Sequence, residues 1–307
     1  MIGIFDSGVG GLSVFREIRK ILPGESYIYY ADNANCPYGD KPAGFVIGRA
    51  REITEFLVKE GAQIIVVACN TATAAAIGTL RAEYSDKESQ ETRQRMLDLS
   101  GGRQDHIMFI GMEPAVKAAA KITKSGVVGV LATSGTLHGE KYINTRDHYS
   151  NGITVVEHVG KGFVELVENG ETSGEHAEQI VSASLKPLLD AGADTIVLGC
   201  THYPFLTETI RKVASYIAPQ REIEIIDPAP AVARHLLDVM NEEGLLHNLR
   251  TGAADDSNRE YPGTAAQETA GTGSVRLVAS SSSQILDRLY SRIEKKELPL
   301  RPPILKI

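Results

Sequence analysis

Two stretches of this sequence decide the fold, IIVVACNT at residues 64–71 and TIVLGCTH at residues 195–202. Each is a run of mainly apolar, β-branched residues that ends in a cysteine followed by hydrogen-bonding side chains. Short apolar runs of this kind predict buried strands, and α/β proteins place their chemistry at the carboxyl ends of such strands. The repetition predicts that Cys69 and Cys200 face one another across a single site.

The sequences around the two cysteines repeat as well. EGAQ at residues 60–63 precedes the first run, and AGAD at residues 191–194 precedes the second. Each half also opens with a short strand that ends in a turn, GIFDSG at residues 3–8 and GVLATSG at residues 129–135. The pattern indicates a duplicated α/β unit, with the convergence of two common strand–helix patterns as the alternative.

Short β-branched runs alternate with longer amphipathic stretches along the chain. This alternation predicts an α/β fold of two similar domains, each with a mostly parallel sheet flanked by helices. The duplication implies a pseudo-two-fold relation between the domains, with the active site in the interdomain cleft. Strands are expected at residues 2–5, 27–31, 64–68, 107–110, 127–131, 153–156, 195–199 and 223–226. The expected helices include residues 11–21, 42–60, 114–123, 161–169, 174–190, 204–216 and 228–243.

The order of these elements predicts the domain boundaries. Residues 1–112 and 228–307 are expected to form the first domain, and residues 113–227 the second. Residues 85–105 and 251–274 are polar and lack a sustained apolar period except around Met96, Leu97 and Leu99. We expect them to be surface insertions, mobile or partly helical, with no share in the core. The remaining tail is expected to pack back on the first domain, with a strand at 275–278 and a helix at 283–296.

The composition is typical of a globular protein that works in water. The chain has 307 residues, of which 42% are hydrophobic and 23% charged, and a net charge of −7. This charge argues against a nucleic-acid or anionic-membrane partner, and no apolar run approaches the roughly 20 residues that span a bilayer. Three cysteines are too few for a disulfide framework, and the first strand follows Met1 without room for a signal peptide, so we expect a cytoplasmic protein. The sequence leaves the oligomeric state open, with a homodimer among the alternatives.

Two loops follow the first two predicted strands. DSGVGG at residues 6–11 opens a helix, and its glycines allow the backbone to turn tightly and approach a ligand. A dinucleotide-binding loop is disfavoured, because the spacing is not Gly-x-Gly-x-x-Gly and Asp6 would repel a phosphate; a plain helix N-cap remains an alternative. In the second loop, residues 32–39, Tyr38 is the large side chain of a turn, and Cys36 is expected to be an inert small residue.

Three other roles are possible for Cys69 and Cys200 besides catalysis. They could be packing residues, as free cysteines often are, or a disulfide, or metal ligands together with His202. The metal site is disfavoured because no Cys-x-x-Cys and no clustered histidines accompany them. A thiol pair acting as acid and base fits best, since a protonated His202 would favour a thiolate nearby. No lysine stands in a recognisable Schiff-base setting, so we expect neither a metal nor an organic cofactor.

The motifs together carry a resemblance to a known family. They are DSGVGG at residues 6–11, PYGDK at 37–41, ACNTA at 68–72 and GCTHYP at 199–204. In this order, the sequence from Gly3 to Asp227 resembles the glutamate racemases, in the cofactor-independent aspartate/glutamate racemase family. The resemblance implies that Cys69 and Cys200 are the catalytic thiols.

The resemblance also implies roles for the residues around the thiols. His202 joins the catalytic group, with Asp32 and Glu168 as carboxylates that support the cysteines from behind. Gly160 and Lys161 depart from the usual family pattern, which leaves the second carboxylate open between Glu165 and Glu168. The implied substrate contacts are Asp6, Ser7, Tyr38, Gly39, Asn70, Thr71, Thr133, Thr136, Thr201 and His202.

The implied activity fits two opposed thiols. Racemisation removes the Cα proton on one face and returns a proton on the other, so it needs a thiolate and a thiol that exchange roles. The family implies the interconversion of L- and D-glutamate, with D-glutamate used for peptidoglycan and no partner beyond this small substrate. The alternatives are a racemase for aspartate or another acidic amino acid, and a non-catalytic protein that binds small carboxylates.

Overall fold

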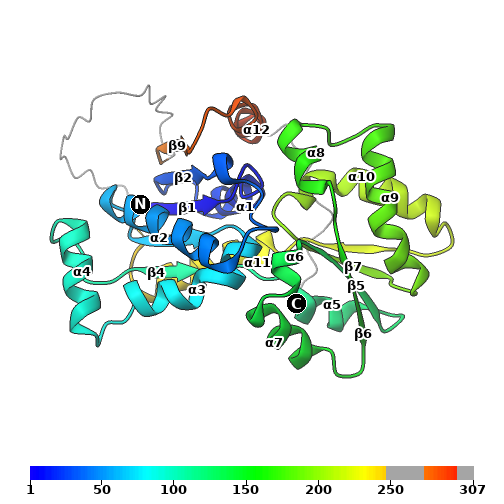
Figure 1. Cartoon of the computed structure of the whole chain (residues 1–307), viewed down its shortest axis with the longest axis horizontal. Coiled ribbons are helices and arrows are strands. Elements are labelled where there is room, and N and C mark those ends of the chain that lie inside the picture. The colour runs from blue at the N-terminus through cyan, green and yellow to red at the C-terminus, as the bar shows by residue number, and fades with distance from the viewer. Residues whose placement is uncertain (247–272, 296–307) are drawn as a thin grey trace.

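The computed structural model describes residues 1–246 and 273–295, which fold around two sheets that lie side by side (Figure 1). The strands of the first sheet are β1 (Ile2–Asp6), β2 (Tyr27–Ala31), β3 (Ile64–Val67), β4 (Met108–Ile110) and β9 (Val275–Ala279). The strands of the second sheet are β5 (Val127–Ala132), β6 (Thr154–Val159), β7 (Thr195–Gly199) and β8 (Glu224–Ile226). Each strand that the sequence predicts is present, with ends that differ by at most a few residues.

The two sheets share one strand order. The first is β4-β3-β1-β2-β9 and the second β6-β5-β7-β8, so β4-β3-β1-β2 corresponds to β8-β7-β5-β6. All strand pairs among the described residues are parallel. This topology confirms the predicted fold class and supports the duplication. It places Cys69 after β3 and Cys200 after β7, at equivalent carboxyl ends.

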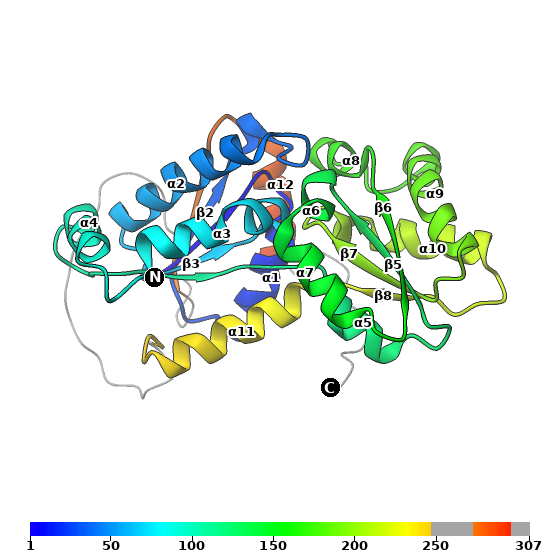
Figure 2. The ribbon, with the colours of Figure 1, turned by 60° about the horizontal axis from the view of Figure 1, so that its bottom comes forward.

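Helices cover both faces of the first sheet (Figure 2). On one face α1 packs against α11 and α12, and on the other α2 packs against α3 and α4. Their bounds are α1 (Leu12–Ile21), α2 (Ala43–Lys59), α3 (Asn70–Tyr84), α4 (Gln90–Ser100), α11 (Ala229–Glu242) and α12 (Gln284–Glu294). Helix α11 follows the last strand of the second sheet and crosses back to α1, and β9 pairs with β2. The predicted domain boundaries stay a prediction.

The second sheet is covered in the same way. Its helices are α5 (Val116–Ile122), α6 (Ser134–Leu137), α7 (Glu140–Tyr149), α8 (Phe163–Asn169), α9 (Glu175–Asp190) and α10 (Thr207–Ile217), with short 3-10 turns η1 (Asn33–Asn35) and η2 (Tyr203–Leu206) elsewhere. Contacts join α9 to α10 on one face and α5 to α7 on the other. One continuous core, which contains Phe15, Leu131 and Leu185, runs from α1 to the α9 side of the second sheet.

The segment 85–105 corrects the sequence prediction. It contains α4, whose N-cap Ser89 accepts a hydrogen bond from the backbone N–H of Thr92. Met96 on this helix is fully buried in the core formed with α2 and α3, and Leu99 packs against it. The expectation that the segment has no share in the core is wrong, because its few apolar residues at helical spacing fall on one face. The other insertion, 251–274, lies almost entirely outside the described residues.

We expect Met96→Ala to lower the free energy of unfolding by about 2–4 kcal/mol, since it leaves a cavity among well-packed neighbours. Gln94→Ala on the exposed face of the same helix is the matched control and should stay within about 0.5 kcal/mol of the parent. Urea denaturation measures both. A Met96 variant as stable as the Gln94 variant would show that α4 is a dispensable surface element.

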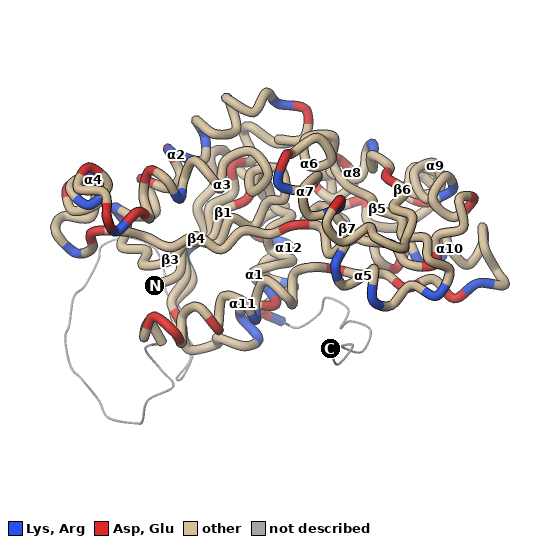
Figure 3. Tube along the Cα trace, turned by 90° about the horizontal axis from the view of Figure 1, so that it is seen from below, with Lys and Arg blue, Asp and Glu red and all other residues tan. Residues whose placement is uncertain are grey.

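Charge on the surface is mixed. Figure 3 shows acidic and basic residues interspersed along outer helices such as α4 and α10. Within residues 1–246 and 273–295, no helix is both long enough and apolar enough to cross a membrane.

Candidate active site

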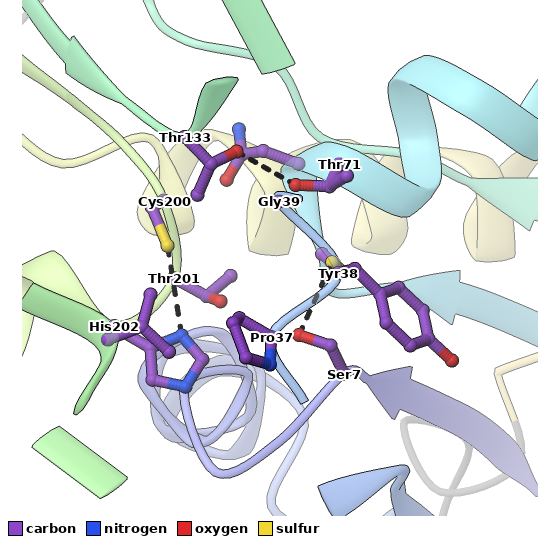
Figure 4. A pocket seen from close by; sticks show the side chains of 12 residues that line it. Ser7, Pro37, Tyr38, Gly39, Thr71, Thr133, Cys200, Thr201 and His202 are labelled. Atoms are coloured by element: carbon purple, nitrogen blue, oxygen red, sulfur yellow. Dashed lines mark hydrogen bonds between the residues drawn. The ribbon is translucent and has the colours of Figure 1, made fainter. Parts of the chain in front are cut away.

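The two sequence-predicted cysteines line one cavity, together with residues from both halves of the chain. Figure 4 shows this cavity, with Cys200 and His202 among the labelled side chains. Its wall is built from loops at the carboxyl ends of strands in both halves, which is where the topology predicts a site. The lining residues are Ser7, Pro37, Tyr38, Gly39, Cys69, Asn70, Thr71, Thr133, Val164, Cys200, Thr201 and His202. Pro37 and Val164 were not predicted, since neither has a polar group that marks it in a sequence.

Cys69 is the N-cap of α3. Its Sγ accepts a hydrogen bond from the backbone N–H of Ala72 at 3.4 Å and donates to Oγ of Ser7 at 3.8 Å. The side chain is almost fully buried, and burial raises the pKa of Cys69 well above its ordinary value. The protonated thiol is therefore its stable form in the free protein.

Cys200 has a different neighbour, the ring of His202. Sγ of Cys200 lies 3.7 Å from Nδ1 of His202, and Nε2 of the same ring lies 2.7 Å from Oε1 of Glu168. The carboxylate of Glu168 also accepts the backbone N–H of Val9 at 2.8 Å. A chain of contacts thus runs from the thiol through the imidazole to a carboxylate.

The two ionisable groups behind Cys200 hold opposite charges. Burial alone would lower the pKa of His202, but its contacts with Cys200, Cys36 and Glu168 outweigh burial and raise this pKa well above the ordinary value. Burial alone would raise the pKa of Glu168, but the hydrogen bond with His202 outweighs it and lowers this pKa. The two cysteines therefore have different neighbours, since Cys200 lies beside the ring of His202 and Cys69 contacts Ser7 and the first turn of α3.

Asp6 organises the turn that carries Ser7. Its Oδ2 accepts the backbone N–H groups of Gly8 and Gly11 at 3.0 and 3.1 Å, and its Oδ1 accepts Oγ1 of Thr201 at 3.2 Å. The turn also needs a glycine at position 10, because a Cβ there would lie 2.3 Å from Nδ1 of His202. Asp6 does not line the cavity, and it joins the loops of the two halves.

Three threonines close the cavity from the opposite side. Oγ1 of Thr71 shares a hydrogen bond with Oγ1 of Thr133 at 2.9 Å, and Thr133 shares one with Thr136 at the same distance. Thr133 is also the N-cap of α6. Nearby, the backbone N–H of Gly135 donates to the carbonyl of Gly39 at 2.9 Å. These contacts link the two halves of the chain. Thr136 lies behind Thr133 and is not among the residues that line the cavity.

Asn70 lines the cavity with a side chain that has no partner. Both its Nδ2 and its Oδ1 are buried without a hydrogen bond. Buried polar side chains are nearly always paired, and an unpaired one costs about 1–3 kcal/mol. An unpaired amide that opens on a cavity is therefore a strong indication that the cavity binds a polar ligand.

Asp32 reaches the site indirectly. Its carboxylate is fully buried, pairs with Arg49 through two contacts of 2.9 Å and accepts the hydroxyl of Tyr38 at 2.5 Å. Tyr38 in turn lines the cavity. The predicted support of the cysteines by Asp32 stays a prediction, and the structure makes Asp32 the anchor of Tyr38. Arg49 was missed because nothing near it in the sequence distinguishes it from other helical arginines.

The structure distinguishes Glu165 from Glu168, the two carboxylates between which the sequence left the assignment undecided. Glu168 contacts His202, whereas Glu165, one turn earlier on α8, is exposed. Glu168 is therefore the carboxylate that lies beside the catalytic candidates.

Comparison with known proteins agrees with this geometry. A family model described as Asp/Glu/Hydantoin racemase matches residues 106–236. A glutamate racemase of Roseiflexus sp. (strain RS-1) is 41% identical over 250 residues, which cover 81% of this chain and 83% of that protein.

Two solved structures are similar over nearly the whole chain. A glutamate racemase isoform from Bacillus anthracis is 29% identical, with a TM-score of 0.74 and coverage of 96% of this chain and 94% of that chain. The Escherichia coli glutamate racemase, in complex with L-glutamate and an activator, is 27% identical, with a TM-score of 0.68 and coverage of 95% and 94%.

The duplicated fold and the cavity with two thiols define the protein as an amino-acid racemase, an isomerase. Its sequence is 41% identical to that of a curated glutamate racemase over about four fifths of its length, which identifies the family within this class. The chain belongs to the glutamate racemase family.

Proposed function

We propose that this enzyme interconverts L-glutamate and D-glutamate by proton transfer at Cα between two thiols. The observation that carries the proposal is the pair of cysteines, which line one cavity from equivalent strand ends of two similar sheets. The L-glutamate in the Escherichia coli structure supports the choice of substrate. The proposal includes what the family resemblance implies, that the enzyme works in the cytoplasm and that its D-glutamate is used for peptidoglycan.

The different surroundings of Cys69 and Cys200 suggest how the free enzyme begins a turnover. Burial holds Cys69 as a thiol, and the proposal assigns the thiolate to Cys200, which lies beside the ring of His202. The thiolate of Cys200 takes the Cα proton of L-glutamate and becomes a thiol. The thiol of Cys69 then gives its proton to the other face, which yields D-glutamate and leaves a thiolate at Cys69. Reaction of D-glutamate reverses each transfer.

The cavity also offers groups that stabilise the negative charge that develops during the transfer. The first turn of α3 lines it with Asn70 and Thr71, and a helix N-terminus favours an anion. Thr133, Thr201 and Ser7 add hydroxyl groups at the same wall. Hydrogen bonds that strengthen as the carbanion forms lower the barrier more than contacts that bind the ground state equally well.

Circular dichroism of L-glutamate incubated with the purified protein tests the proposal. The expected signal decays to zero without any added cofactor, and L-aspartate gives a much slower decay. A faster decay with L-aspartate would favour the aspartate racemase. Binding of L-glutamate without decay or Cα exchange in heavy water would favour the non-catalytic carboxylate binder.

Activity should survive exhaustive chelation of metals and treatment with hydroxylamine. This result is expected because two thiols supply both proton transfers, so the reaction needs no Schiff base and no Lewis acid. The racemisation rate before and after each treatment is the measurement. A loss after chelation that zinc restores would show instead that the metal takes part in the reaction.

Asn70→Ala should raise KM about tenfold or more while leaving the free energy of unfolding unchanged or higher. The amide has no partner in the free protein, so removing it removes the cost of burying an unpaired polar group. The ligand loses a hydrogen-bonding group of the protein, which weakens its binding. Kinetics and urea denaturation on the same sample give the two numbers. An unchanged KM together with a clear loss of stability would show that the amide has a structural partner instead.

A further inference from the structure

The strongest cluster outside the proton-transfer pair lies behind His202. Sγ of Cys36, Oε1 of Glu168 and a ring nitrogen of His202 all lie within 4.8 Å of one another. Sγ of Cys36 donates to Oε1 of Glu168 at 3.7 Å, and it also contacts the His202 ring. A thiolate, an imidazole and a carboxylate are the three ligand types that proteins use for zinc.

The spacing is close to what a zinc ion needs. With zinc–ligand distances of about 2.0–2.3 Å in a tetrahedron, ligand atoms lie about 3.3–3.6 Å apart. The separation of 3.7 Å between Cys36 and Glu168 already fits. Only the hydrogen bond of 2.7 Å between His202 and Glu168 must open, by about 0.6 Å. Position 8 must be a glycine for these two ligand atoms to stay where they are, because a Cβ there would lie 2.1 Å from Glu168 Oε1 and 2.9 Å from Cys36 Sγ.

An ion can reach this cluster from solvent. Cys36 is partly exposed, and the side chain of Glu168 is 21% exposed, whereas His202 is buried behind them. Three protein ligands leave the fourth tetrahedral position for water. We propose that Cys36, Glu168 and His202 form a zinc site, and that zinc bound there inhibits the enzyme reversibly.

The inhibition follows from the place of His202 beside Cys200 and rests on the proposed role of Cys200. Zinc takes Nε2 of His202 and Oε1 of Glu168 as ligands, so the 2.7 Å hydrogen bond between these two atoms must open. The opening moves the ring whose Nδ1 lies 3.7 Å from Sγ of Cys200. The imidazole and the carboxylate are then held by the metal and no longer support this thiol.

The test compares the parent with Cys36→Ser, which keeps a hydroxyl donor toward Glu168 and removes the soft ligand. His176→Ala is the matched control, because His176 forms an exposed pair with Glu171 away from the cavity. Metal-stripped proteins are titrated with zinc at free concentrations set by a metal buffer, since glutamate itself binds zinc. Bound zinc and the racemisation rate are measured together, and Co²⁺ replaces zinc to show a thiolate-to-cobalt charge-transfer band.

We expect the parent and the His176 variant to bind one zinc and to lose activity in proportion. Each rate is compared with the metal-free rate of the same variant, and Cys36→Ser should lose both the inhibition by zinc and the cobalt band. Its affinity for zinc should fall more than about 100-fold, beyond the loss that removing an outer-shell partner causes. A Cys36 variant inhibited like the parent would overturn the site and assign the metal to Cys69 and Cys200. Zinc bound through Cys36 without a change in rate would overturn the inhibition. The cobalt band does not depend on racemisation. It therefore tests the zinc site even if the proposed function is wrong.

Discussion

Replacing Cys69 or Cys200 with alanine will lower the rate of racemisation at least about 100-fold. This is the lower end of what a positioned general acid or base contributes, and each thiol serves one face of Cα. Both directions must fall together in each variant, because the equilibrium constant between enantiomers is one. Circular dichroism started from either enantiomer measures the two rates.

The third cysteine provides the matched control for this prediction. Cys36 lies next to the His202–Glu168 pair but outside the cavity lining, so Cys36→Ser removes no proton-transfer group and should lower the rate far less than either alanine substitution. If Cys69→Ala or Cys200→Ala racemises as fast as the parent, that thiol is structural. The duplication would then describe the fold and would not describe the mechanism.

Glu168→Gln should lower kcat/KM at least about tenfold, equivalent to about 1.4 kcal/mol in the barrier, and change its pH dependence. The carboxylate helps to raise the pKa of His202, so its loss lowers that pKa. The imidazolium is present below the pKa of His202 and is lost as the pH rises through it. The fall in kcat/KM on the alkaline side that reports His202 should therefore begin at a lower pH in the variant.

Glu165→Gln is the control for this variant, because it makes the same chemical change one helical turn away on an exposed position. It should leave both the rate and the pH profile unchanged. Equal effects of the two substitutions would assign the result to the charge of α8 as a whole. A Glu168 variant with the parental pH profile would show that the carboxylate does not act through His202.

The features that the sequence predicted are those encoded by short contiguous stretches. The strands before Cys69 and Cys200 are continuous apolar runs, and parallel pairing brings their carboxyl ends into corresponding places. Helix α3 was not among the expected helices, because its alanine- and threonine-rich sequence has only a weak amphipathic period. The role of the small residues around the thiols came from family resemblance, and the structure now gives them contacts.

The features that could not be predicted depend on contacts between distant segments. Glu165 and Glu168 both belong to one short helix, and only the position of His202, 34 residues beyond Glu168, distinguishes them. Met96 becomes a core residue only because α2 and α3 leave a place for it. The lack of a partner for Asn70 is a property of the assembled cavity, and no sequence pattern reports it.

The most direct test of the two-thiol mechanism is Cα exchange in heavy water under single-turnover conditions. Each cysteine-to-serine variant is mixed in excess with one enantiomer, and deuterium at Cα is measured by mass spectrometry. By family analogy, Cys200 serves L-glutamate and Cys69 serves D-glutamate. We predict that Cys69→Ser retains exchange mainly from L-glutamate and Cys200→Ser mainly from D-glutamate. Equal exchange from both enantiomers in either variant would contradict the assignment of one thiol to each face.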